Sequence, residues 1–211
     1  PIDCPYNIRC ADYVSCSKSS YLYKFDMFDA LKENGIFLLN TNATTLEEME
    51  ALLPGKAKRI LARKNARLFV VDATALAGKY HLGKYVNTTM GIVYFKLTGC
   101  MDVEEVVPIM KKMVEKTYIK KGEHIVRNNW DCIDNSLEAV HQIEYPREAW
   151  MNAEVEKPHE IEGAPEFVNK VMLPIVRYEG DNLPVSAFRP GGVMPSGTTQ
   201  YEKRGIAIMN P

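Results

Sequence analysis

The sequence contains no apolar run that approaches the ~20 residues of a membrane-spanning helix, and no secretory signal is visible. It also lacks an excess of charge of either sign, because 26 Lys and Arg residues face 27 Asp and Glu residues, for a formal net charge of -1. This balance excludes a strong global attraction to nucleic acid or to an anionic membrane. The composition, with 46% hydrophobic and 25% charged residues, is that of a folded globular protein. We therefore expect a cytoplasmic protein with no nucleic-acid and no membrane partner.

Closely spaced cysteines are also missing. Zinc and iron–sulfur sites typically need paired spacings such as C-x-x-C, and none occurs. An odd number of widely spaced cysteines also argues against a disulfide framework. We predict no metal site, and reduced, mostly buried thiols at Cys4, Cys10, Cys16, Cys100 and Cys132.

The common catalytic and nucleotide-binding motifs are absent. There is no G-x-G-x-x-G, and the Gly192-x4-Gly197 spacing is followed by Thr198 where a phosphate loop has lysine. No H-E-x-x-H places two metal ligands on one helix face. Ser186 lacks the flanking glycines of a nucleophile elbow. The sequence thus gives no candidate catalytic residue.

Strand and helix patterns alternate through the first two-thirds of the chain. Residues 11–16 alternate apolar and polar side chains, as in a short strand. Residues 36–39 and 68–72 are apolar runs, the second ending in the carboxylate of Asp72, and such runs are typical of strands with helices on both faces. Helical periodicity predicts helices over residues 21–32, 44–53, 56–65, 73–80, 87–97, 103–118 and 123–139.

Local signals refine two of these helices. Phe25, Phe28 and Leu31 have helical spacing, and Asn34-Gly35 would end that helix because glycine accepts a left-handed conformation. Thr44 and Glu47 have the spacing of a capping box at the start of the second helix.

The regular pattern dissolves from about residue 144. Eight prolines fall in the last 70 residues, and the stretches 180–188 and 195–207 are dense in Gly, Pro, Ser and Thr. The alternation before this point predicts a three-layer α/β/α fold with a mainly parallel sheet. We therefore expect an α/β domain over residues 1–143 and an extended Pro/Gly-rich C-terminal segment over residues 144–211.

Two groups of basic residues are compatible with more than one role. Each suits a solvated helix face, and the two together could also hold a phosphate-rich small molecule or meet a neighbouring domain. The first group is Lys56, Lys58, Arg59, Arg63, Lys64 and Arg67, and the second is Lys111, Lys112, Lys116, Lys120 and Lys121.

Several blocks occur in an order that resembles the pyruvate:ferredoxin (flavodoxin) oxidoreductases, across essentially the whole chain. The element Thr199-Gln200-Tyr201-Glu202-Lys203-Arg204 is especially specific to that family. The other blocks are Asn87–Met90, Tyr94–Gly99, Lys116–Tyr118, Lys120–Glu123, Gly180–Phe188 and Gly197–Ala207.

The resemblance implies a γ-type domain followed by the Glu-Lys-Arg signature segment. In the family, the whole enzyme oxidatively decarboxylates pyruvate to acetyl-CoA and passes electrons to ferredoxin or flavodoxin. Thiamine diphosphate, Mg and [4Fe-4S] clusters would then belong to domains outside this chain, which would be an inactive fragment by itself. The γ-type domain of the family begins with a Gly-rich strand–turn–helix segment, and the resemblance implies that this chain starts well after that segment.

The resemblance also suggests what this part contributes. Coenzyme A is expected to dock on the γ-type domain, and the signature blocks hold Lys96, Lys120, Lys121, Asn128 and Asn129 as its candidate contacts. Tyr201, Glu202, Lys203 and Arg204 are expected to contact other domains of the same polypeptide, in a parent enzyme that is a homodimer. The alternative is a purely structural interdomain module that binds no ligand of its own.

Overall fold

A computed structural model describes residue 8 and residues 10–201 of the chain. The chain divides into two compact units. The first unit holds the residues up to Leu22 together with Phe28–Val155, and the second holds Tyr23–Met27 together with the chain from Glu156 onward. The first unit thus extends to Val155 along the main part of the chain, and the short segment Tyr23–Met27 belongs to the second unit.

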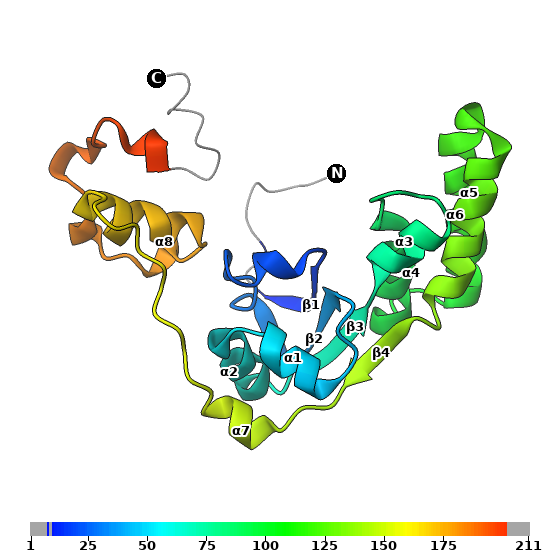
Figure 1. Ribbon diagram of the computed structural model, residues 1–211, viewed down its shortest axis with the longest axis horizontal. Coiled ribbons are helices and arrows are strands. Elements are labelled where there is room, and N and C mark those ends of the chain that lie inside the picture. Colours follow the sequence, from blue (N-terminus) through cyan, green and yellow to red (C-terminus); the bar gives the residue numbers. More distant parts are fainter. Residues whose placement is uncertain (1–7, 9, 202–211) are drawn as a thin grey trace. The chain divides into compact units, whose positions relative to one another are not determined.

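A mainly parallel sheet forms the centre of the first unit (Figure 1). Its strands lie in the order β1 (Ala11–Cys16), β2 (Leu31–Asn40), β3 (Arg67–Val71) and β4 (Val140–Ile143). The first three are parallel, and β4 pairs with β3 in the antiparallel sense. Ile36–Leu39 and the apolar residues of β3 form the predicted buried strands, so the α/β fold class is confirmed.

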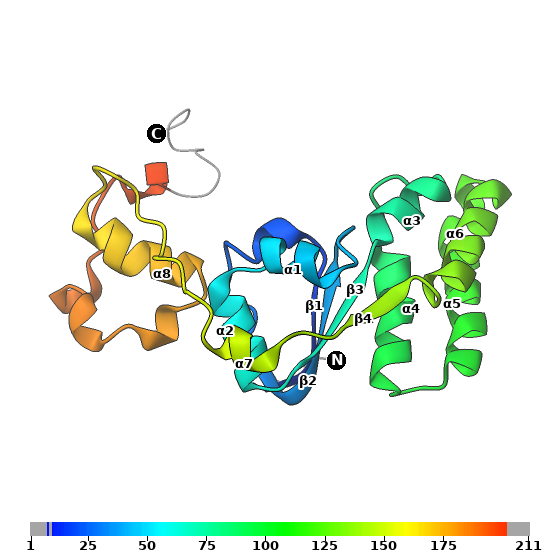
Figure 2. The same ribbon diagram turned by 60° about the horizontal axis from the view of Figure 1, so that its bottom comes forward.

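Helices cover both faces of this sheet (Figure 2). One group, α1 (Leu46–Leu52) and α2 (Gly55–Arg63), connects β2 to β3. The other group connects β3 to β4. Its helices α4 (Asn87–Thr98), α5 (Val103–Tyr118) and α6 (Glu123–Ser136) pack their apolar side chains against Leu38 and Val71 of the sheet. On the opposite face, the rings of Phe28 and Phe37 lie 4.6 Å apart. The remaining α-helices among the described residues of this unit are α3 (Ala73–Lys79) and α7 (Arg147–Met151).

The predicted helix over residues 21–32 is wrong. The chain forms a short 3₁₀ turn at Ser19–Tyr21, then turns, and β2 begins at Leu31. The physical reason is tertiary: the ammonium of Lys64 binds the carbonyl oxygens of Phe28, Asp29 and Leu31, at distances of 2.5–3.1 Å. These carbonyl groups therefore bind a lysine instead of helical amides.

The Asn34-Gly35 pair consequently lies inside β2 and ends no helix. Asn34 has a φ of 58°, and the register between β1 and β2 shifts here, since Ala11 pairs with Leu31 whereas Tyr13 pairs with Ile36. The pair thus forms an irregularity at which β2 bends, a common use of a left-handed residue in a strand.

The capping box of α1 lies one residue later than predicted. Thr45 accepts a hydrogen bond from the amide of Glu48, and Glu48 accepts one from the amide of Thr45. A further hydrogen bond from the amide of Thr44 is the largest cause that holds the pKa of Glu48 below its ordinary value. The two ends of the box are therefore both satisfied, as the motif requires.

The second unit has less regular structure. Residues 156–161 contain neither helix nor strand, as expected for an extended segment, but the chain then forms helical turns. Prolines start several of them: Pro174 lies in the first turn of α8 (Leu173–Val176), and Pro184 directly precedes a 3₁₀ turn. Proline is tolerated at such positions because the first amides of a helix need no partner within it. The other turns are Val168–Met172, Gly180–Asn182, Val185–Ala187, Pro190–Gly192 and Thr198–Tyr201.

Candidate functional site

A polar pocket of about 440 Å³ lies at the carboxyl ends of β1, β2 and β3. Ligands of open parallel sheets commonly bind at this edge, because loops and helix starts converge there. The pocket combines hydroxyl, amide, carboxylate and ammonium groups. Its lining residues are Ser17, Lys18, Ser19, Asn40, Thr41, Asn42, Asp72, Thr74 and Ala75.

Asn40, the last residue of β2, holds this pocket together. Its side-chain amide donates to the carbonyl oxygen of Ser17 at 2.9 Å and to Oγ1 of Thr74 at 3.0 Å. Its Oδ1 accepts from the amide of Ala73 at 2.9 Å. One buried side chain thus joins the end of β1 to the start of α3.

Two neighbouring side chains satisfy the backbone around the pocket. Oγ1 of Thr41 accepts from the amide of Ala43 at 3.1 Å, and Asp72 accepts from the amide of Ala75 at 2.8 Å as the N-cap of α3. These groups therefore give the pocket a defined shape. In contrast, the exposed ammonium of Lys18 makes no ion pair or hydrogen bond with another described residue. It is the cation of this pocket that is available to an anionic ligand.

The chemistry of the pocket favours holding a polar molecule. It contains no histidine or thiol side chain that would transfer a proton near neutral pH. Within residues 10–201, no group of three His, Cys, Asp or Glu side chains is arranged to hold a metal ion. The apolar run that ends in a carboxylate predicted the place of Asp72 at a strand end, whereas Asn40, Thr41 and Lys18 were missed. The signal was the change from apolar to polar residues where β1 and β2 end.

The five predicted coenzyme contacts do not form one pocket. Lys96, near the end of α4, donates a hydrogen bond to the carbonyl oxygen of Leu137, just after α6. Lys120 and Lys121 lie in the 3₁₀ turn Ile119–Lys121, just before α6. The 14 residues of α6 separate these two places by roughly 21 Å.

The two asparagines lie on α6. Asn129 is buried, donates to the carbonyl oxygen of Ile125 at 2.8 Å and accepts from Thr88 of α4 at 3.2 Å. Its side chain therefore links two helices. Asn128 is half-buried. The side chain of Lys120 is exposed and makes no hydrogen bond or ion pair with another described residue. Nζ of Lys121 lies 5.3 Å from the ring centroid of Tyr118.

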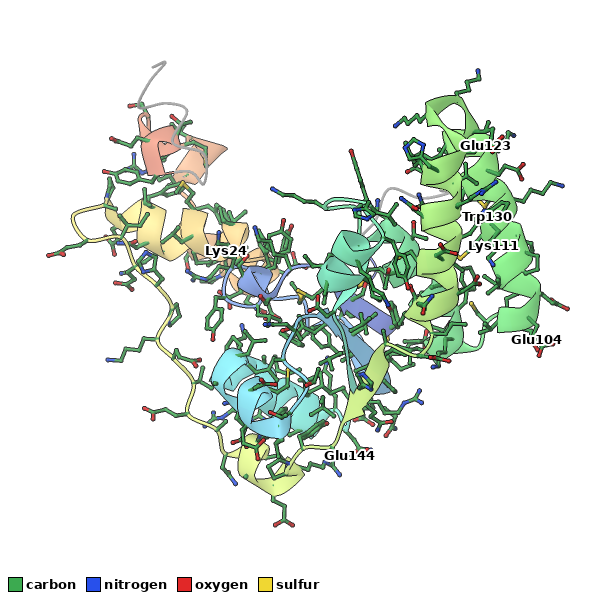
Figure 3. All side chains as sticks on the ribbon, turned by 45° about the vertical axis from the view of Figure 1, so that its right-hand side comes forward. Lys24, Glu104, Lys111, Glu123, Trp130 and Glu144 are labelled. Atoms are coloured by element: carbon green, nitrogen blue, oxygen red, sulfur yellow. The ribbon has the colours of Figure 1, made fainter. Side chains whose placement is uncertain are left out.

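Several residues of the basic groups bind main-chain carbonyls of the fold. Lys58 donates to the carbonyl oxygen of Glu50 at 2.7 Å, and Arg59 donates to that of Ala153 at 2.6 Å. Together with Lys64, described above, they stabilise the loops around α2. In the second group, Lys111 forms an ion pair with Asp134 at 2.6 Å (Figure 3 labels Lys111 beside Trp130).

The remaining predicted residues are the cysteines and the C-terminal signature. Of the cysteines within the described residues, Cys16 and Cys132 are buried, whereas Cys10 and Cys100 are exposed. Tyr201 ends the last 3₁₀ turn, and Glu202, Lys203 and Arg204 lie outside the described residues. No helix in residues 10–201 is long and apolar enough to cross a membrane.

Comparison with known proteins explains the two units. Residues 1–139 match the model of the pyruvate ferredoxin/flavodoxin oxidoreductase family, and residues 153–207 match EKR, a domain of unknown function. The whole chain is 40% identical over 211 residues to a pyruvate:ferredoxin oxidoreductase of Moorella thermoacetica and 37% identical over 213 residues to a pyruvate-flavodoxin oxidoreductase of Klebsiella pneumoniae. In both cases it spans 18% of the relative's length.

A solved structure supports the fold. The pyruvate oxidoreductase subunit PORC of Thermotoga maritima matches with a TM-score of 0.50 and 21% identity, over 64% of this chain and 66% of that one. The family model covers most of the first unit, and the relatives match along the full chain, which confirms the resemblance inferred from the signature blocks. The chain belongs to the pyruvate ferredoxin/flavodoxin oxidoreductase family.

Proposed function

We propose that this chain acts as a domain of an enzyme that oxidatively decarboxylates pyruvate to acetyl-CoA and passes the electrons to ferredoxin or flavodoxin. The observation that carries this proposal is the 40% identity along its entire length to a pyruvate:ferredoxin oxidoreductase. Since the chain spans 18% of that relative, other parts of a longer polypeptide would hold thiamine diphosphate, Mg and the [4Fe-4S] clusters. The whole enzyme would be a cytoplasmic homodimer.

Within that enzyme, we propose that the chain docks coenzyme A. The polar pocket at the carboxyl edge of the sheet supports this role, because its amides, hydroxyls and the ammonium of Lys18 suit the phosphate and amide groups of this coenzyme. Lys120, Lys121 and Asn128 form a second proposed contact region before and within α6. Lys96 and Asn129 are bonded within the fold, so their part in docking is to position α4 and α6.

Calorimetric titration of the 211-residue chain with coenzyme A tests this role. We expect binding at millimolar or lower concentrations, weakened about tenfold by Lys18→Ala or by the double change Lys120→Ala/Lys121→Ala, since each removes a charge-assisted contact. Lys24→Ala is the matched control, because Lys24 is an exposed lysine of the second unit (Figure 3). The variant that weakens binding identifies the docking region. Titrations without heat would leave only the structural role described next.

One observation favours the alternative of an interdomain module with no ligand of its own. The second unit exposes many large apolar side chains, among them Val185, which is 90% exposed, and Tyr178, Val193 and Met194. Exposed apolar side chains that form a contiguous patch commonly mark a contact surface, and on this alternative these residues would form such a patch. Tyr201, Glu202, Lys203 and Arg204 would extend this surface onto neighbouring domains. Hydrogen exchange in a longer form of the enzyme should then protect residues 178–201 relative to the 211-residue chain.

A further inference from the structure

The second unit has a pocket of its own, which encloses about 440 Å³. It lies between the helical segment that leads into α8 and the turns that follow residue 185 (Figure 1). Its apolar wall includes the half-buried ring of Phe167, the buried Val171 and the half-buried Ala187. Sites for small molecules commonly have this size and combine an apolar wall with a few polar groups.

Two polar groups of this pocket have no partner in the fold. The exposed guanidinium of Arg189 and the exposed hydroxyl of Ser186 make no hydrogen bond or ion pair with another described residue. A guanidinium presents two parallel N–H groups that match the two oxygens of a carboxylate, and a hydroxyl can donate one more hydrogen bond. The pocket therefore offers unused donors for one anionic group.

The other charges of the pocket favour a ligand with a single negative charge. Lys170 binds the carboxylate of Glu166 one helical turn away, and this contact lowers the pKa of Glu166 and raises the pKa of Lys170. Both groups are therefore charged at neutral pH and balance each other. Arg189 remains as the uncompensated charge among the lining side chains. The second charge of a phosphate ester would have no free cation here and would lie near Glu166.

The backbone of the apolar wall is also unusual. Residues Val168–Met172, which include Lys170 and Val171 of the pocket, form a π turn directly before α8. Such turns are rare and frequently occur at functional sites. The irregular helix is thus an indication of a binding role that is independent of the unpaired polar groups.

We propose that this pocket binds a small carboxylic acid with an apolar or aromatic body. Arg189 and Ser186 hold the carboxylate, and the body packs against Phe167, Val171 and Ala187. Packing removes apolar surface of both ligand and pocket from water, which favours binding. The site lies entirely within the second unit, so it does not depend on the coenzyme docking proposed for the first unit.

Ligand-observed NMR of the 211-residue chain with 3-phenylpropionate tests the proposal, because broadening of the phenyl proton signals reports binding. We expect a Kd of about 1 mM, which is typical of a ligand with so few atoms. The amide 3-phenylpropionamide lacks the charge, and pyruvate lacks the apolar body. Each should bind about tenfold more weakly. Phenyl phosphate should also bind more weakly than 3-phenylpropionate, and tighter binding would overturn the preference for a carboxylate.

Variants of Arg189 identify the site. Arg189→Gln should weaken the binding of 3-phenylpropionate about tenfold, and Arg189→Lys, which keeps the charge but loses the paired donors, should have an intermediate effect. Lys157→Gln is the matched control, because Lys157 is an exposed cation of the same unit that does not line the pocket. It should leave the Kd unchanged.

Two results would overturn the proposal. One is an Arg189→Gln chain that binds 3-phenylpropionate as tightly as the wild type. The other comes from N-acetyl-phenylalanyl-aspartyl amide, which carries a carboxylate and an aromatic ring on a peptide. Binding of this peptide without binding of 3-phenylpropionate would assign the pocket to a polypeptide segment and not to a small molecule.

Discussion

The role of Asn40 in joining β1, β2 and α3 can be tested by truncation. Asn40→Ala removes the acceptor of the Ala73 amide in a buried position, which costs about 1–3 kcal/mol. It also removes two hydrogen bonds to Ser17 and Thr74, whose exposed groups can bind water instead, for a net loss of about 1 kcal/mol. We therefore expect the free energy of unfolding of the first unit to fall by about 2–4 kcal/mol.

The assay can be restricted to the first unit. Both tryptophans, Trp130 and Trp150, belong to this unit, so the change of their fluorescence in urea reports its unfolding alone. For a urea dependence of about 2 kcal/mol per molar, the loss corresponds to a midpoint lower by about 1–2 M. The slope of the transition should not change, since the native fold is retained.

Two further variants test how the loss of stability depends on which side chain of the pocket is changed. Thr74→Val removes one exposed partner of Asn40 and should cost about 0.5–1.5 kcal/mol. Asn42→Ala changes an exposed asparagine of the same pocket wall and should cost less than about 0.5 kcal/mol. If the free energy of unfolding of Asn40→Ala lies within about 0.5 kcal/mol of the wild-type value, the buried hydrogen bonds do not hold this edge of the sheet together, and the reasoning is refuted.

Two other predictions concern glycine positions and a thiol. Gly55→Ala should destabilise the first unit by about 3 kcal/mol in the same assay, because a Cβ atom there would lie 1.6 Å from the carbonyl oxygen of Glu154. In contrast, a Cβ atom at Gly78 in α3 would meet no atom within 4 Å, so Gly78→Ala should stabilise the unit by about 0.5–1 kcal/mol. Equal effects of the two changes would contradict the close approach. The rate at which Cys100 reacts with iodoacetamide should rise with pH, with a midpoint below the ordinary thiol pKa. The largest cause that lowers the pKa of Cys100 is a hydrogen bond from Thr98 at 3.2 Å, and a second hydrogen bond comes from Tyr94. Thr98→Val should raise that midpoint, measured by mass spectrometry of the alkylated peptide across pH, and an unchanged midpoint would show that the hydroxyl does not stabilise the thiolate.

The parts of the fold that the sequence predicted are those with strong local patterns. The apolar run at Ile36–Leu39 can be buried only within a sheet covered on both faces, and α4, α5 and α6 carry apolar side chains at helical spacing. Capping and stop signals were less precise. Thr44 and Thr45 both have a glutamate three residues later, and only the structure shows that Thr45 starts the helix.

The missed elements depend on contacts between distant residues. The strand β4 has two exposed side chains, His141 and Gln142, and it is defined by antiparallel pairing with β3 and by no apolar pattern of its own. The segment around Phe28 has a helical pattern, yet Phe28 packs on Phe37 and its carbonyl binds Lys64. In both cases a tertiary contact decides the local structure, which a short window of sequence does not contain.

The same principle changes how the basic residues of this chain are interpreted. By composition every lysine and arginine is a candidate phosphate contact, but Lys58, Arg59, Lys64 and Lys96 donate to main-chain carbonyl oxygens of the fold. Such a cation would have to give up a charge-assisted hydrogen bond before it could bind a ligand, and the carbonyl left behind would lose its partner. Lys18 and Lys120 have no such bond to lose within the described residues. A search for the anionic ligand of this domain should therefore begin at these two positions, and at Lys18 first because it lines a pocket at the carboxyl edge of the sheet.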